Sequence, residues 1–225
     1  MIALRRYGIA FAGWLGLALL ILAVLPFALY AVEFGLGGAG VVPATPSRFF
    51  SQAAPVASAG IALHMVAGGA MTVLAPLQLL GPVRRRWPAA HRWLGRGLVA
   101  MAIVTGLGGL VFIAGRGTIG GGPMNAGFAV YGLAMTWSAA LAWRFARDRD
   151  FDRHRRWALR LFVLILGSWL YRVMYGLWEL AADGAGSRPD FGGPFDLVMV
   201  WTCYLQWLPL LELRFLAERR AGARA

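Results

Sequence analysis

The sequence predicts an all-α, polytopic integral membrane protein whose six transmembrane helices form one bundle over residues 1–225. Hydrophobic residues make up 59% of the chain and charged residues only 14%, an apolar excess over the composition of soluble domains. The apolar runs are long enough to cross a hydrocarbon core of about 30 Å, which takes about 20 helical residues. They also lack the alternation of outer-membrane strands. The six predicted helices cover residues 9–31, 59–81, 97–115, 126–146, 160–181 and 197–216.

The first helix follows a short basic region containing Arg5 and Arg6. Its apolar stretch is longer than the roughly 7 to 15 residues of a signal peptide's apolar region, so it is predicted to remain as a membrane helix. Three of the helices contain a proline, which lacks a backbone donor and is expected to kink them locally. These prolines are Pro26, Pro76 and Pro209, in the first, second and sixth helices.

The connections between helices alternate in charge. The N-terminus, the connection after the second helix, the connection after the fourth and the C-terminal region are rich in arginine. The other three connections are rich in glycine and proline, and their basic residues are only Arg48, Arg116 and Arg188. By the positive-inside rule, both termini are predicted to be cytoplasmic and the chain to lie in the inner membrane of a bacterial cell.

Several function classes are disfavoured by the composition. The formal net charge is +12, but the charges lie between apolar runs and not on a soluble basic face, so nucleic acid is not an expected partner. Cys203 is the only cysteine, which excludes an internal disulfide or a cysteine-based metal site within one chain. No catalytic triad or metalloprotease spacing is present, and no catalytic residue or metal site is predicted.

Polar residues within the second and fifth predicted helices form a candidate intramembrane site. An arginine in the bilayer costs about 2.5 to 3.5 kcal/mol on insertion scales, so it usually faces the bundle interior with a partner. Helical spacing places the polar residues of each segment on a common face. An outward-opening pocket is one interpretation, and a structural pair of Arg172 with Glu179 is the other. The candidate residues are His64, Gln78, Ser168, Arg172, Tyr175 and Glu179.

Two of the three histidines lie in matching basic phrases, "HRWLGR" from His91 and "HRRWALR" from His154. The two phrases are predicted to lie close together on the cytoplasmic side, as a site for an anion such as a lipid phosphate, a haem propionate or a quinone headgroup. Ordinary interfacial anchoring is a second interpretation. The candidate residues are His91, Arg92, Trp93, Arg96, His154, Arg155, Arg156, Trp157 and Arg160.

A third interpretation makes His91 and His154 the axial ligands of one b-type haem, since imidazoles are good iron ligands. Two bis-histidine haems would need four histidines, and the chain has three. At most one haem is therefore compatible with the sequence.

The stretch "LHMVAGGAMTVLAPLQLLGPVRRRWPAAHRWLGR", followed by "HRRWALRLFVLILGSWLYRVMY", resembles the bacterial predicted membrane protein family called domain of unknown function 2306. The resemblance covers residues 60–175 and includes His64, Gln78, Arg172 and both histidine phrases. It implies a multi-helix membrane protein and supplies no mechanism.

Two functions of different classes follow from these residues. The first is a membrane-embedded redox carrier that binds one haem b or a quinone. The second is a transporter or receptor for a small ligand, or a lipid-binding structural protein. Anionic lipid headgroups are expected partners in either case, because arginine clusters lie at the predicted membrane surface. The sequence identifies no protein partner.

Overall fold

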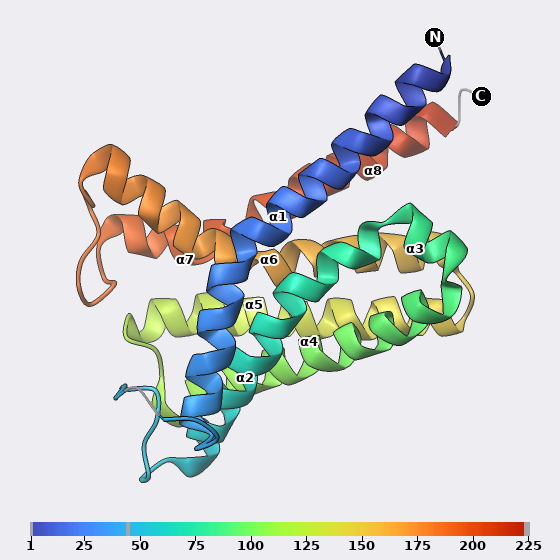
Figure 1. Ribbon diagram of the computed structural model, residues 1–225. Coiled ribbons are helices and arrows are strands. Elements are labelled where there is room, and N and C mark those ends of the chain that lie inside the picture. The colour runs from blue at the N-terminus through green and yellow to red at the C-terminus, as the bar shows by residue number, and fades with distance from the viewer. Residues whose placement is uncertain (1, 44–45, 223–225) are drawn as a thin grey trace.

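The computed structural model describes residues 2–43 and 46–222, and every regular element in these ranges is a helix (Figure 1). Five of the described helices are long and apolar enough to cross a membrane. They correspond to the first five predicted transmembrane segments. The elements are α1 (Ile2–Gly38), α2 (Pro55–Leu74), the 3-10 helix η1 (Ala75–Leu79), α3 (Gly81–Arg86), α4 (Pro88–Arg116), α5 (Gly121–Arg147), α6 (Phe151–Ala182), α7 (Pro194–Leu205) and α8 (Trp207–Gly222).

The bundle has two chemically distinct ends. We call the end that holds α3, the start of α4, the end of α5 and the start of α6 the arginine-rich end. The opposite end, which holds the connections between α1 and α2, α4 and α5, and α6 and α7, is the loop end. Arg5 and Arg6 lie within α1, but they are outside the part of the chain whose side chains are described.

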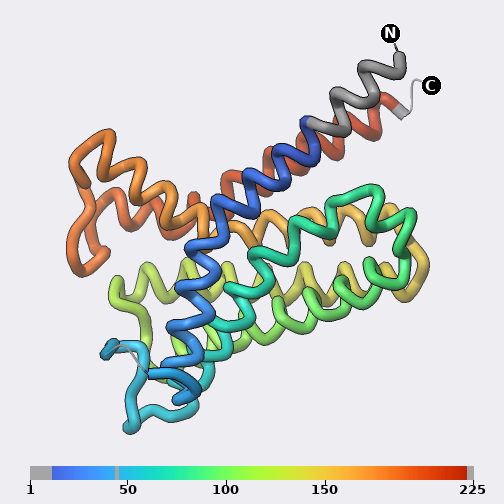
Figure 2. The backbone as a smooth tube through the Cα atoms, in the orientation of Figure 1, coloured from blue at the N-terminus to red at the C-terminus, as the bar shows by residue number. Residues whose placement is uncertain are grey.

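The predicted sixth helix over residues 197–216 is interrupted, and its span of the membrane is not confirmed. The segment is split at Gln206 into α7, with 12 residues, and α8, with 16. Pro209 has no N–H and cannot bond to the carbonyl of Leu205 four residues earlier, so the helix breaks where only a kink was expected. Each half alone is shorter than the roughly 20 residues that span a bilayer. Figure 2 shows α8 leaving the bundle in the same direction as the part of α1 that begins at residue 12.

The other two prolines act as local distortions. Pro76 lies where α2 gives way to η1, a tighter 3-10 turn. Pro26 lies inside α1, which continues through it and is bent in its middle part (Figure 1). The 3-10 turn changes which residues of the second predicted helix share a face, and this affects the position of Gln78.

Helix α2 lies between α1 and α4 and packs closely on both. A Cβ atom at Gly69 would lie 2.8 Å from the carbonyl oxygen of Ala28 in α1. On the opposite side, a Cβ at Gly60 would lie 2.9 Å from the carbonyl oxygen of Gly108 in α4. Small residues therefore bring the backbones together, as in many membrane helix pairs. Beyond α4, the helices continue as α5 on α4, α6 on α5, and α7 on both α5 and α6.

The core between α5, α6 and α7 is organised around two buried tyrosines. The rings of Tyr131 and Tyr204 are stacked, with their centres 4.7 Å apart. Each hydroxyl donates to a backbone carbonyl, that of Tyr131 to Leu164 and that of Tyr204 to Gly127 at 3.0 Å. Both polar groups are thus satisfied inside an apolar bundle, which membrane burial requires. This pair attaches α7 to the bundle although the following helix diverges from it.

The glycine contact between α2 and α4 gives a direct test of the packing. Gly108→Ala should lower the thermal unfolding temperature in detergent, because its Cβ would meet the Gly60 carbonyl and overpacking costs about 1 to 3 kcal/mol. That cost exceeds the gain of about 1 kcal/mol that alanine brings to a helix. The control is Gly176→Ala in α6, where a Cβ meets nothing within 4 Å, so its unfolding temperature should stay equal or rise. Equal unfolding temperatures for the two variants would contradict the close contact.

Candidate functional site

His64 of α2 is held against the backbone of α4. Its Nδ1 lies 2.8 Å from the carbonyl oxygen of Thr105. A carbonyl can only accept, so Nδ1 carries the proton and Nε2 keeps a free lone pair. Gly109 makes this approach possible, because a Cβ there would lie 3.0 Å from the imidazole Nδ1. The result is a fixed ring that offers one acceptor or ligand atom within the bundle.

A small cavity of about 30 Å³ adjoins this imidazole. All of α1, α2, α4, α5 and α6 contribute to its wall, among them through Phe27, His64, Thr105, Tyr131 and Ser168. The Thr105 side chain is 3% exposed, and its hydroxyl oxygen is buried without a hydrogen-bond partner among the described residues. The walls are mainly apolar, with a few polar groups, and a cavity of this size has room for about one water molecule.

Arg172 does not line this cavity but contacts two residues of its wall. Its Nη1 donates to the carbonyl oxygen of Ser168 at 3.0 Å and lies 3.3 Å from the Ser168 hydroxyl. The guanidinium carbon is 4.7 Å from the centre of the Phe27 ring in α1, within cation–π range. Ser168 and Phe27 both line the cavity, so Arg172 bridges α6 to α1 at its border. Its charge also acts on His64.

Arg172 forms no ion pair with Glu179 or any other carboxylate in the described part of the chain. The alternative interpretation, a structural pair between these two residues, is therefore not what the structure contains. Glu179 instead lies against the turn after α6, where a Cβ on Gly184 would be 2.7 Å from its Oε2. The arginine is left with neutral partners only, which is unusual for a cation at membrane depth.

Two other predicted members of the intramembrane site lie elsewhere. Gln78 belongs to η1, and its Nε2 donates to the carbonyl oxygen of His91 at 3.0 Å, at the arginine-rich end. It is separated from His64 because 14 residues of helix advance about 21 Å, and because the 3-10 turn rotates it off the α2 face. Tyr175 donates to Asp196 of α7 at 2.7 Å. The structure therefore brings together His64, Ser168 and Arg172, with Thr105, Tyr131 and Phe27 as members that the sequence did not reveal.

Asp196 organises the loop end and was also missed from the sequence. Its carboxylate is 1% exposed and accepts from the side chains of Tyr175 and Ser187 and from the backbone amides of Arg188 and Gly193. Burial raises the pKa of this carboxyl, but these donors outweigh it and hold the pKa below its usual range. The only sequence signal is its position in the first turn of α7, after Gly193 and Pro194.

The two histidine phrases meet the bundle at the arginine-rich end. His154 Nδ1 lies 2.9 Å from the carbonyl oxygen of Ala142, so its Nε2 is also free. His91 Nδ1 and Gln78 Oε1 are buried without hydrogen-bond partners among the described residues. The predicted shared site of His91 and His154 stays a prediction.

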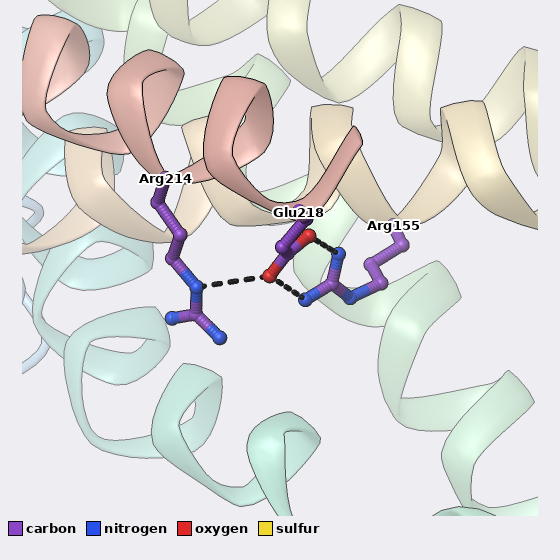
Figure 3. Close-up of polar contacts among 3 residues, drawn as sticks. All are labelled: Arg155, Arg214 and Glu218. Carbon is purple, nitrogen blue, oxygen red and sulfur yellow. Dashed lines mark hydrogen bonds and ion pairs between the residues drawn. The ribbon is translucent and has the colours of Figure 1, made fainter. Parts of the chain in front are cut away.

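The arginines of the second phrase are neutralised in part by α8. Arg155 donates to both oxygens of Glu218, at 2.8 and 3.0 Å, and Arg214 adds a third contact at 3.1 Å (Figure 3). Arg160 donates to Glu212 at 2.7 Å. These pairs between α6 and α8 leave no signal in the sequence, because the partners are 63 and 52 residues apart and no short motif joins them. Charge that was expected to require an external anion is thus partly compensated within the chain.

The remaining basic residues of the two phrases pack on aromatic rings or face outward. Arg96 lies over Trp93 and Trp143, and Arg160 over Trp157. Arg156 lies over Phe215 of α8. Arg92 is exposed. These contacts are typical of residues at a membrane surface.

The haem interpretation of His91 and His154 stays a prediction. The Nε2 of His154 fits an axial ligand, because ligating histidines commonly donate their other nitrogen to a carbonyl.

A family model described as "Predicted membrane protein (DUF2306)" matches residues 61–214. The match starts in α2 and ends in α8, so it extends beyond the predicted range of 60–175. No curated protein and no solved structure gives a match.

The contact between Glu218 and Arg155 can be tested through its pH dependence. Hydrogen bonds from Arg155 lower the pKa of the Glu218 carboxyl to about 2, from an ordinary value of 4.5. A depressed pKa means that the contact contributes to the folded state above pH 4.5 and is lost as the pH falls toward 2. Spin labels at residues 152 and 221 in a Cys203→Ala background should therefore report a narrow distance distribution between pH 7 and pH 5.

The double variant Glu212→Gln with Glu218→Gln should broaden this distribution at every pH, because both ionic contacts between α6 and α8 are removed. Asp190→Asn is the control, since its ion pair with Arg188 lies at the loop end. A narrow distribution in the double variant would show that apolar contacts alone position α8.

Proposed function

Because the chain belongs to the DUF2306 family of predicted membrane proteins, we propose that it acts within the membrane as a carrier that binds a quinone. The ligand would enter between α1 and α6, where Arg172 lies at the border of the polar cavity. A redox carrier is the corresponding function, because a quinone held in this way can exchange protons with the protein and electrons with a partner.

One observation carries the proposal. The imidazole of His64, whose Nε2 makes no hydrogen bond among the described residues, lines a small cavity in the bundle, and Arg172, which has no carboxylate partner in those residues, contacts Ser168 and Phe27 of the cavity wall. Arg172 is exposed on the bundle surface, and a cation that faces a bilayer without a charged partner is costly unless a ligand or water satisfies it. The orphaned Thr105 hydroxyl points to the same conclusion.

The chemistry of the site suits a flat ligand with carbonyl oxygens. The guanidinium of Arg172 is a donor for one carbonyl oxygen, and His64 Nε2 is an acceptor for a hydroxyl of the reduced ligand. The ring of Phe27 gives an apolar wall beside these polar groups. The cavity of about 30 Å³ is too small for the headgroup, so the side chains around it have to rearrange to admit the ligand.

The second candidate is a transporter or receptor for a small carboxylate ligand. It is favoured by the lack of a carboxylate partner for Arg172 in the described residues. A ligand carboxylate would form the bidentate contact that arginine prefers. His64 would then serve as a neutral hydrogen-bonding partner.

We further propose that the protein lies in the inner membrane with both termini in the cytoplasm and that α7 and α8 together form a bent sixth crossing. The asymmetry of arginines between the two ends of the bundle supports this orientation. A reporter that is active only in the cytoplasm should be active when fused after Ala225, and a reporter that is active only in the periplasm should not. Activity of a periplasmic reporter at this position would reverse the assignment.

The quinone proposal predicts that the purified protein binds decylubiquinone and that Arg172→Gln weakens this binding at least tenfold. Quenching of tryptophan fluorescence gives the dissociation constant. Arg153→Gln is the matched control, because Arg153 lies on the same helix, is exposed and sits at the arginine-rich end. His64→Asn keeps a donor for the Thr105 carbonyl but lacks Nε2, and it should weaken binding of the reduced ligand more than that of the oxidised one.

The outcomes separate the two candidates. Binding of decylubiquinone that depends on Arg172 supports the carrier. Binding of benzoate that depends on Arg172, with no binding of decylubiquinone, supports the carboxylate receptor and overturns the quinone proposal. Equal affinities in wild type and Arg172→Gln for both compounds overturn the site itself.

A further inference from the structure

A second and larger concavity lies at the arginine-rich end, away from the cavity beside His64. It is a groove of about 490 Å³ between the N-terminal half of α1 and the junction of η1 with α3. Gly13, Gly16 and Leu17 line one side, and residues 79–82 with Arg85 line the other. Its walls are mainly apolar.

The groove is open space beside two glycines of α1. A Cβ atom at Gly13 or Gly16 would meet nothing within 4 Å. Elsewhere α1 approaches α2 closely, for example at Gly35, where a Cβ would lie 2.7 Å from the Val66 side chain. The N-terminal half of α1 instead diverges from the bundle (Figure 1). An apolar space of this kind at membrane depth is filled by hydrocarbon.

Positive charge lies at the mouth of the groove. Arg84, Arg85 and Arg86 are all exposed on α3. None of the three belongs to an ion pair within the described residues. The guanidinium of Arg85 folds back toward the groove, with Nη1 3.2 Å from the position of a Cβ on Gly81. The cluster is therefore free to bind an anion directly beside an apolar slot.

Two exposed tryptophans lie near the arginine-lined opening of the groove and indicate its level relative to lipid headgroups. Trp14 on α1 is 48% exposed and Trp87 at the end of α3 is 58% exposed. Exposed tryptophan is enriched at the level of lipid headgroups. Phosphate at the arginines and hydrocarbon below them would match the order of groups in a phospholipid.

We propose that this groove is a binding site for one anionic phospholipid. An acyl chain occupies the space beside Gly13 and Gly16, and the phosphate binds Arg85 with its neighbours Arg84 and Arg86. The arginines select the anionic headgroup, because a net negative charge is not offset by a choline as it is in a zwitterionic lipid. The site is independent of the proposed quinone function, since the two share no residue.

The test is native mass spectrometry of the full-length protein in detergent with dioleoyl phosphatidylglycerol or dioleoyl phosphatidylcholine. The two lipids have the same chains, so a difference reports the headgroup. We expect at least fivefold tighter binding of the first phosphatidylglycerol molecule than of phosphatidylcholine. The triple variant Arg84→Gln, Arg85→Gln and Arg86→Gln should remove this preference while weak binding of both lipids persists.

A larger side chain in the groove tests where the acyl chain of the lipid binds. Gly16→Leu should reduce the affinity for phosphatidylglycerol at least fivefold without a loss of folded protein, because the added side chain meets open space. Gly97→Leu in α4 is the matched control, since its Cβ also meets nothing within 4 Å and it lies at the same end of the bundle. Its affinity should equal that of wild type.

Equal binding of the two lipids to wild type would overturn the proposal. So would an unchanged affinity in Gly16→Leu, which would show that the lipid binds at another surface. Loss of decylubiquinone binding in Arg172→Gln bears only on the function proposed above, so failure of either proposal leaves the other standing.

Discussion

The close backbone contact between α2 and α4 is the constraint on which the polar cavity depends. Gly60 and Gly108 allow the two helices to approach until a Cβ on either would meet the other backbone. At this separation the imidazole of His64 reaches the carbonyl of Thr105, with Gly109 leaving room for the ring. A wider spacing would leave a buried histidine without a partner and cost free energy. The close packing of α2 on α4 and the position of His64 in the cavity therefore both depend on the contact between Gly60 and Gly108.

Hydrophobic runs were sufficient to predict the first five transmembrane segments, because a helix that crosses a bilayer must be apolar over its whole length. The break at Gln206 was not predicted, since Pro209 was expected to bend a helix and not to end one. Gln78 was assigned to the face of His64 on the assumption of uniform α-helix, and η1 breaks that assumption. Thr105 could not be found at all, because an ordinary threonine becomes notable only when its surroundings leave it unpaired.

Charge compensation at the arginine-rich end shows a further limit of sequence reasoning. The arginines of the second histidine phrase were expected to need an external anion, yet Glu212 and Glu218 of α8 contact Arg160 and Arg155. Helix α8 is thus positioned by these ionic contacts and by the packing of Arg156 and Arg160 on the ring of Phe215. Arg84, Arg85 and Arg86 on α3 have no such partner in the described chain. Arginines without an ion-pair partner in the described chain are therefore concentrated next to the groove.

Helix α1 is the element that the cavity and the groove have in common. Phe27 and Ala31 wall the cavity, and Gly13 to Leu20 line the groove. Among the described elements, α1 packs mainly on α2 and touches η1, so it has fewer neighbours than any other long helix of the bundle. The family match begins only at residue 61, after α1, whereas His64, Thr105, Tyr131 and Ser168 all lie inside it. The cavity wall contributed by α2, α4, α5 and α6 thus lies inside the matched region, whereas the wall contributed by α1 lies outside it.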